Sequence, residues 1–209
     1  MQVENIRTEQ SLRGAEMADT PYRCQPFPVP LHSRNHCVSE ECCCVVFLII
    51  VAMHIPIMTQ GNWNPVLLTS DLRCEAREAG SFLASIAHSH AADHKKLAYI
   101  AGGETVVHLT GKGLGSRNQE LALAAAEGIA GLPNVAIFSV GSDGTDGPTD
   151  AAGGYVDGST KEKLLAQGIA VADVLEQNDA YHALERCDGL IKTGATGTNV
   201  NDVAVVLVY

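Results

Sequence analysis

Three polar, glycine-containing segments carry the residue types that phosphoryl transfer needs. The first, residues 111–120, reads GKGLGSRNQE and contains Lys112 and Arg117. Glycine lets a backbone approach a ligand closely, N–H groups at a helix start attract anions, and arginine can hold phosphate or carboxylate through two parallel hydrogen bonds. The segment therefore predicts an anion-binding loop. The alternative interpretation is a plain strand-to-helix turn, in which Asn118 caps the helix and Arg117 pairs with Glu120.

The second segment, residues 141–154, reads GSDGTDGPTDAAGG and contains Asp143, Asp146 and Asp150. It follows an apolar run that predicts a strand, and open α/β sheets place their ligands beyond the carboxyl ends of strands. These carboxylates could hold Mg²⁺ or accept a proton from an attacking hydroxyl. The alternative is a turn in which the carboxylates bond their own backbone. Three acids this close together repel one another, which favours a functional role.

The third segment, residues 193–202, reads TGATGTNVND and also follows an apolar run. Its hydroxyls, amides and glycine N–H groups could bind phosphate or sugar-like hydroxyls, although such loops are common. The three segments are more informative together, because one offers cations, one carboxylates and one neutral donors. Phosphoryl transfer requires this combination.

The elements that must position these loops follow from the hydrophobic pattern after residue 64. Apolar runs predict strands at residues 66–69, 97–101, 105–110, 135–140, 190–193 and 203–208. Helical spacing predicts helices at residues 75–90, 118–130, 159–167 and 179–187. This alternation predicts an α/β fold with a mixed or parallel sheet covered by helices.

The composition argues against some classes of function and indicates the cellular compartment. The chain has 209 residues, 46% of them hydrophobic, and a formal net charge of −10, which argues against binding nucleic acid or anionic lipid. Its seven cysteines show no metal-ligand spacing, and their odd number with no signal peptide predicts a reducing compartment. We expect a cytoplasmic protein. A mitochondrial location is the alternative, which the acidic residues near the N-terminus do not favour.

Residues 1–63 differ from residues 64–209, and we treat them as an atypical, poorly ordered N-terminal segment. They show no sustained helical or strand period, apart from an apolar run at residues 42–53. A membrane-spanning helix needs roughly 20 apolar residues, so this run is too short to favour a span. Its β-branched residues are as consistent with a buried strand. A membrane-tethered domain remains an alternative.

Four motifs resemble, in order and spacing, the MOFRL domain, the C-terminal domain of the glycerate 2-kinase and hydroxypyruvate reductase-like family. They lie at residues 102–105 (GGET), 111–120, 141–153 and 193–202. The resemblance reaches upstream through residues 70–80, where Cys74 stands in place of the glycine of the family's Gly-Glu-Ala-Arg sequence.

The resemblance implies ATP-dependent phosphorylation of D-glycerate at its 2-hydroxyl, with Mg²⁺, in a cleft between two domains. The family's larger Rossmann-like domain supplies a catalytic lysine and much of the nucleotide site, and residues 1–61 show neither its glycine-rich turns nor its βαβ pattern. We therefore expect a chain that lacks most of that domain and shows little or no turnover. The alternative is a non-catalytic truncated isoform that acts as an anion-binding or interaction module.

Carried over by position, the resemblance gives Arg117 the role of holding glycerate carboxylate or the transferring phosphate. Asp143 and Asp146 are the other predicted catalytic residues, and together with Asp150 they are the predicted metal ligands. The supporting substrate or phosphate contacts are Glu104, Lys112, Gly113, Gly115, Ser116, Asn118, Thr196 and Asn199. Surface left bare by the absent domain predicts homo-oligomers.

Overall fold

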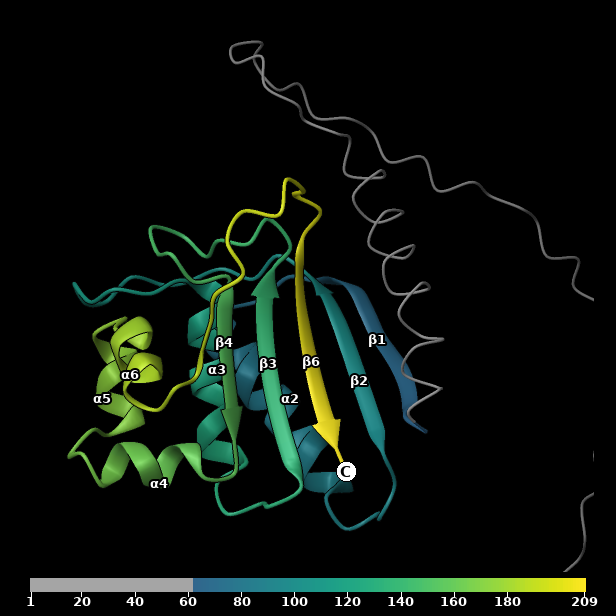
Figure 1. Ribbon diagram of the computed structural model, residues 1–209. Coiled ribbons are helices and arrows are strands. Elements are labelled where there is room, and N and C mark those ends of the chain that lie inside the picture. The colour runs from purple at the N-terminus through teal and green to yellow at the C-terminus, as the bar shows by residue number, and fades with distance from the viewer. Residues whose placement is uncertain (1–61) are drawn as a thin grey trace, which may run out of the picture. The chain divides into compact units, whose positions relative to one another are not determined.

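The apolar runs of the second half of the chain form the strands of one mixed sheet. The computed structural model describes residues 62–209, and the six strands within that range lie in the order β1-β2-β6-β3-β4-β5 (Figure 1). Their bounds are β1 Asn64–Leu72, β2 Leu97–Gly103, β3 Val135–Gly141, β4 Gly153–Asp157, β5 Leu190–Ile191 and β6 Asp202–Val208. The pair β1–β2 is parallel and the other neighbouring pairs are antiparallel, which confirms the predicted α/β class with a mixed sheet.

Two helices pack on one face of this sheet, as Figure 1 shows. They are α2 (Ala76–His90) and α3 (Arg117–Gly128), and their contact is rich in alanine and glycine. A carbon atom added at Gly80 of α2 would lie 2.2 Å from the carbonyl oxygen of Leu121 in α3, so the two backbones are closely apposed. Small side chains permit this approach, and Leu83, Leu121 and Leu123 fill the core beside it.

Three short helices follow β4 in the chain: α4 (Thr160–Leu165), α5 (Val171–Glu176) and α6 (Ala180–Arg186). Figure 1 places them beyond the β4 side of the sheet, where the buried side chains of Leu164, Val171 and Leu184 extend the core. Helices α4 and α6 match two predicted helices, whereas α5 and β4 were not predicted.

The strand predicted at residues 105–110 is wrong. That stretch forms a loop whose one bridge joins Val106 to Glu75, and the side chains of Val106 and Leu109 are 63% and 77% exposed. Its apolar residues suggested a strand, but the N–H group of Thr110 donates to the side chain of Asn178 instead of to a neighbouring strand.

Within the described part of the chain, no helix is both long enough and apolar enough to cross a membrane. The apolar run at residues 42–53, like the rest of the atypical segment up to residue 61, lies outside the described residues.

Candidate functional site

The three motif loops begin at one edge of the sheet. Asp202, the first residue of β6, pairs in register with Gly103 at the end of β2 and with Gly141 at the end of β3. The loops that follow β2 and β3 and the loop that precedes β6 therefore emerge together, at the upper end of the sheet in Figure 1. The three segments that carry the polar motifs therefore lie at the same end of the sheet.

Arg117 lies at this edge, and carboxylates hold its guanidinium group. Its Nε donates to Asp202 Oδ2 at 2.5 Å and its Nη2 donates to Asp202 Oδ1 at 3.1 Å. Glu104 Oε1 lies 3.6 Å from the same Nη2. The hydrogen bond to Asp202 raises the pKa of Arg117, so the side chain stays protonated, and 32% of it is exposed. The alternative pairing of Arg117 with Glu120 is wrong, because Arg117 pairs with Asp202, which lies 85 residues further along the chain.

Asp146 accepts hydrogen bonds from the start of α3. Its Oδ1 accepts hydrogen bonds from the backbone N–H and side-chain Nδ2 of Asn118, at 3.3 and 3.2 Å, and its Oδ2 accepts from Gln119 N at 2.9 Å. Asn118 Oδ1 in turn accepts from Ser139 at 2.6 Å. Burial raises the pKa of Asp146, although the N–H donors act in the opposite direction. Asp146, rather than Asn118, therefore satisfies the N–H groups that open the helix.

Replacing Asp146 with alanine is expected to lower the free energy of unfolding by about 2 kcal/mol, because buried N–H donors of α3 lose their acceptor. Urea denaturation followed by circular dichroism measures this change. Asp143→Ala is the matched control, since that side chain accepts an exposed hydrogen bond from Thr145 N. Equal midpoints for the two variants would show that Asp146 does not stabilise the helix start.

The three aspartates predicted as metal ligands have separate partners. Asp146 faces the start of α3, Asp143 accepts from Thr145, and Asp150 lies 2.7 Å from the Tyr181 hydroxyl and 3.0 Å from Lys192 Nζ. Among residues 62–209, no group of three or more His, Cys, Asp or Glu side chains is arranged to hold a metal ion. The residues present do not fit an all-protein Mg²⁺ site, and we assign no chemical step to a metal here.

The backbone of the first loop is bonded to protein rather than left open. Three of its N–H groups, those of Gly111, Gly113 and Leu114, donate to the turn between α5 and α6, as does the N–H of Thr110 just before it. The expectation that glycine N–H groups of this loop are available to an anion therefore does not hold for Gly111 and Gly113. Lys112 is exposed, whereas Gly115, Ser116 and Arg117 are partly exposed.

Ser142 joins the second loop to the third. Its Oγ accepts hydrogen bonds from Val200 N at 2.8 Å and Asn201 N at 3.2 Å, and its carbonyl oxygen accepts from the hydroxyls of Thr196 and Thr198. Thr196, predicted as a ligand contact, thus also shapes its own loop, while Asn199 is exposed.

Four residues that organise the site were not predicted: Arg77, Glu120, Asn178 and Asp202. Asp202 closes the third motif, so its place at a predicted strand start was a usable signal. Asn178 precedes a predicted helix and has a positive φ of 52°, a conformation that asparagine tolerates better than most residues. Arg77 and Glu120 each lie inside a motif, at residues 70–80 and 111–120, but no local pattern shows that they pair, because 43 residues separate them.

The comparisons with known proteins agree with this architecture. Residues 97–202 match the MOFRL family. The chain is 42% identical over 207 residues to a D-glycerate 2-kinase of Thermotoga maritima, covering 97% of this chain and 47% of that protein. A glycerate 2-kinase of Pyrococcus horikoshii is 44% identical over 152 residues, covering 70% of this chain and 34% of that protein. The crystal structure of glycerate kinase from Thermotoga maritima superposes with a TM-score of 0.72 and 49% identity, over 74% of this chain and 38% of that one.

These coverages show how much of each relative the chain matches. The chain spans 47% or less of the two relatives named above. An alignment over 97% of the chain also includes most of residues 1–63. The matched family region, residues 97–202, contains all three motif loops and ends at Asp202. The chain belongs to the MOFRL family.

Proposed function

We propose that this chain forms part of a glycerate 2-kinase, which transfers a phosphoryl group from ATP to the 2-hydroxyl of D-glycerate. The observation that carries the proposal is the convergence of three motif loops on the Arg117–Asp202 pair at one sheet edge. The relatives named as glycerate kinases support the same reaction and substrate.

In this proposal Arg117 binds the carboxylate of D-glycerate or the transferring phosphate. Asp202 holds the guanidinium in one orientation, so less side-chain freedom is lost when the anion binds. Lys112 adds positive charge from the exposed part of the first loop, and Asp143 contacts the substrate hydroxyl. Asp146 acts by fixing the start of α3, which carries Arg117. Gly115, Ser116, Thr196 and Asn199 remain candidates for neutral contacts.

The chain by itself is still expected to show little or no turnover. Phosphoryl transfer depends on positioning both substrates and excluding water, and a partial cleft supplies less of each. A test must therefore measure D-glycerate binding as well as ADP release in the presence of ATP and Mg²⁺.

Arg117→Ala is expected to weaken D-glycerate binding by roughly 10- to 100-fold, because a charge-assisted contact is lost. Isothermal titration calorimetry of the purified chain measures the affinity, and a coupled ADP-release assay runs beside it. Arg186→Ala, which removes an equal charge from the exposed last turn of α6, is the matched control. Because Arg117→Ala also leaves Asp202 unpaired, Arg117→Lys tests the site with its charge retained.

Equal D-glycerate affinity in the Arg117 and Arg186 variants would overturn the role of Arg117. Turnover by the chain that disappears in Arg117→Ala would show that the chain carries a complete site, contrary to the expectation of little or no activity.

A further inference from the structure

A buried asparagine lies beneath the first motif loop. Asn178, in the turn between α5 and α6, is 4% exposed and has a φ of 52°. Its Oδ1 accepts hydrogen bonds from Thr110 N at 2.7 Å and Gly111 N at 2.8 Å. Its Nδ2 donates to His108 O and to Glu120 Oε2, both at 3.1 Å. One side chain therefore satisfies three backbone groups of the loop that leads to the anion site.

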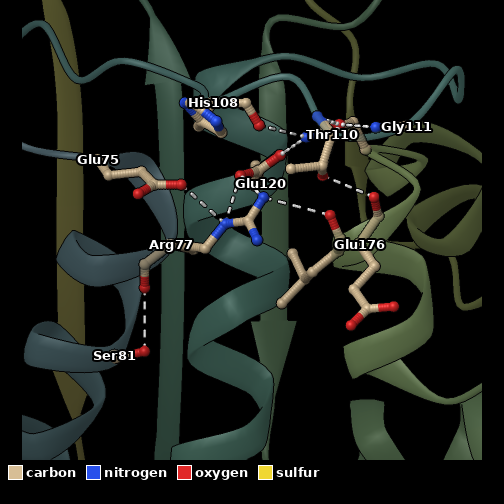
Figure 2. A network of polar contacts seen from close by, with 10 residues as sticks. Glu75, Arg77, Ser81, His108, Thr110, Gly111, Glu120 and Glu176 are labelled. Atoms are coloured by element: carbon tan, nitrogen blue, oxygen red, sulfur yellow. Dashed lines mark hydrogen bonds and ion pairs between the residues drawn. The ribbon is translucent and has the colours of Figure 1, made fainter.

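An ion pair holds the carboxylate that this amide faces. Glu120 is 2% exposed, and its Oε1 lies 3.1 Å from Nε and 3.0 Å from Nη2 of Arg77. Figure 2 shows Arg77 between Glu75 and Glu120, and its Nη2 also donates to Leu175 O at 3.3 Å. The carboxylate of Glu120 and the carbonyl of His108 both accept from the amide nitrogen of Asn178, while the two loop N–H groups donate to its oxygen, and these partners agree on one orientation of the amide.

The same turn holds the next part of the loop. Gly113 N donates to Gln177 O at 2.7 Å, and Leu114 N donates to Asp179 Oδ1 at 2.8 Å. A carbon atom added at Gly111 would lie 2.3 Å from Gln177 backbone, so the loop lies directly against the turn. The chain continues from Leu114 to Arg117 at the start of α3. The position of the loop therefore limits where the Arg117 guanidinium can lie.

We propose that Asn178 is a positioning residue for the anion site, and that the Arg77–Glu120 pair supports it from beneath. Asn178 holds residues 108–114 in place, and these in turn locate Lys112 and the approach to Arg117. The ligand is a small carboxylate or phosphate anion, which Asn178 itself does not touch. The identity of the natural ligand, D-glycerate, rests on the function proposed above. The contacts of Asn178 with the loop do not depend on that function.

The first test is Asn178→Gly in the full chain. Glycine suits a positive φ, so this change removes the side-chain bonds without straining the backbone. Amide exchange of residues 108–114 is expected to accelerate roughly tenfold or more, with faster tryptic cleavage after the exposed Lys112. D-glycerate affinity is expected to fall about three- to tenfold, since loop order must be restored on binding. Asp188→Gly is the matched control, because Asp188 also has a positive φ, of 58°, and is exposed.

A reciprocal exchange separates positioning from general support of the fold. Asn178→Asp keeps the acceptor for the loop amides but sets two carboxylates against each other, so exchange should rise and affinity should fall. Adding Glu120→Gln restores a donor and an acceptor between positions 178 and 120 and keeps the total charge, while His108 O stays without its donor. The double variant is expected to recover D-glycerate affinity to within about threefold of the parent chain.

Unchanged exchange in Asn178→Gly would overturn the proposal, and so would faster exchange with unchanged affinity. No recovery in the double variant would also count against it. Inorganic phosphate serves as a second probe in every titration. If the chain bound phosphate but not D-glycerate, the proposed kinase function would be wrong, and the phosphate titrations would still test the positioning role of Asn178. Binding of neither anion would overturn both proposals.

Discussion

Replacing Glu120 with alanine is expected to lower the free energy of unfolding by about 3 kcal/mol. The change leaves Arg77 without its buried partner and Asn178 Nδ2 without one of its two acceptors. Breaking a buried ion pair from one side costs about 3–5 kcal/mol, and we expect the lower end because the Arg77 side chain is 24% exposed. Urea denaturation followed by far-ultraviolet circular dichroism gives the value.

Glu127→Ala is the control for this prediction. Glu127 lies on the same helix and pairs with Lys161 at 2.5 Å, but both side chains are substantially exposed, so its loss should cost less than about 1 kcal/mol. Replacing both Arg77 and Glu120 with apolar residues should cost less than Glu120→Ala alone, because the one carboxylate that loses Arg77, Glu75, is 32% exposed and no buried charge is left unpaired. Similar losses from Glu120→Ala and Glu127→Ala would contradict the importance assigned to the buried pair.

Gly80→Ala is expected to destabilise the chain by about 3 kcal/mol, although alanine normally favours a helix over glycine by about 1 kcal/mol. The added carbon would meet the carbonyl oxygen of Leu121 at 2.2 Å and the side chain of Ala124 at 3.1 Å. Helices α2 and α3 would have to separate, and overpacking of this kind typically costs about 1–3 kcal/mol or more. Thermal and urea unfolding measure the change.

Ser81→Ala provides the comparison one residue along α2. Ser81 is exposed, and its hydroxyl bonds the carbonyl of Arg77 in its own helix, so alanine there should be neutral or slightly stabilising. A stabilising effect of Gly80→Ala would show that helix propensity exceeds the packing cost, and that the two helices can move apart freely.

The elements that could be predicted from the sequence are those with a strong local pattern. Helices α2 and α3 follow from apolar spacing, and β3 and β6 follow from runs of buried residues. Strand β4 was missed because Gly153 and Gly154 look like part of a loop. A carbon atom added at Gly154 would lie 2.6 Å from Leu184, so glycine is needed there for a distant packing contact that no local pattern records.

The candidate site was predictable in its loops but not in its internal contacts. The motifs placed Arg117 correctly at a helix start, yet its partner Asp202 comes from a distant strand rather than from the next helical turn. The acidic loop was correctly assigned to this edge, but the spacing of its aspartates could not show that Asp146 is buried under α3. These partners depend on strand order, which the sequence alone left open.

That order also affects how the site can form during folding. Strand β6 is the last described strand in the chain, yet it lies between β2 and β3. Until it inserts, the pair β1–β2 and the group β3–β4–β5 have no strand to join them, and Arg117 lacks its carboxylate partner. Contacts of such long sequence separation are slow to form, because loop closure must precede them. The anion site is therefore expected to be completed late in folding, after synthesis of its final strand.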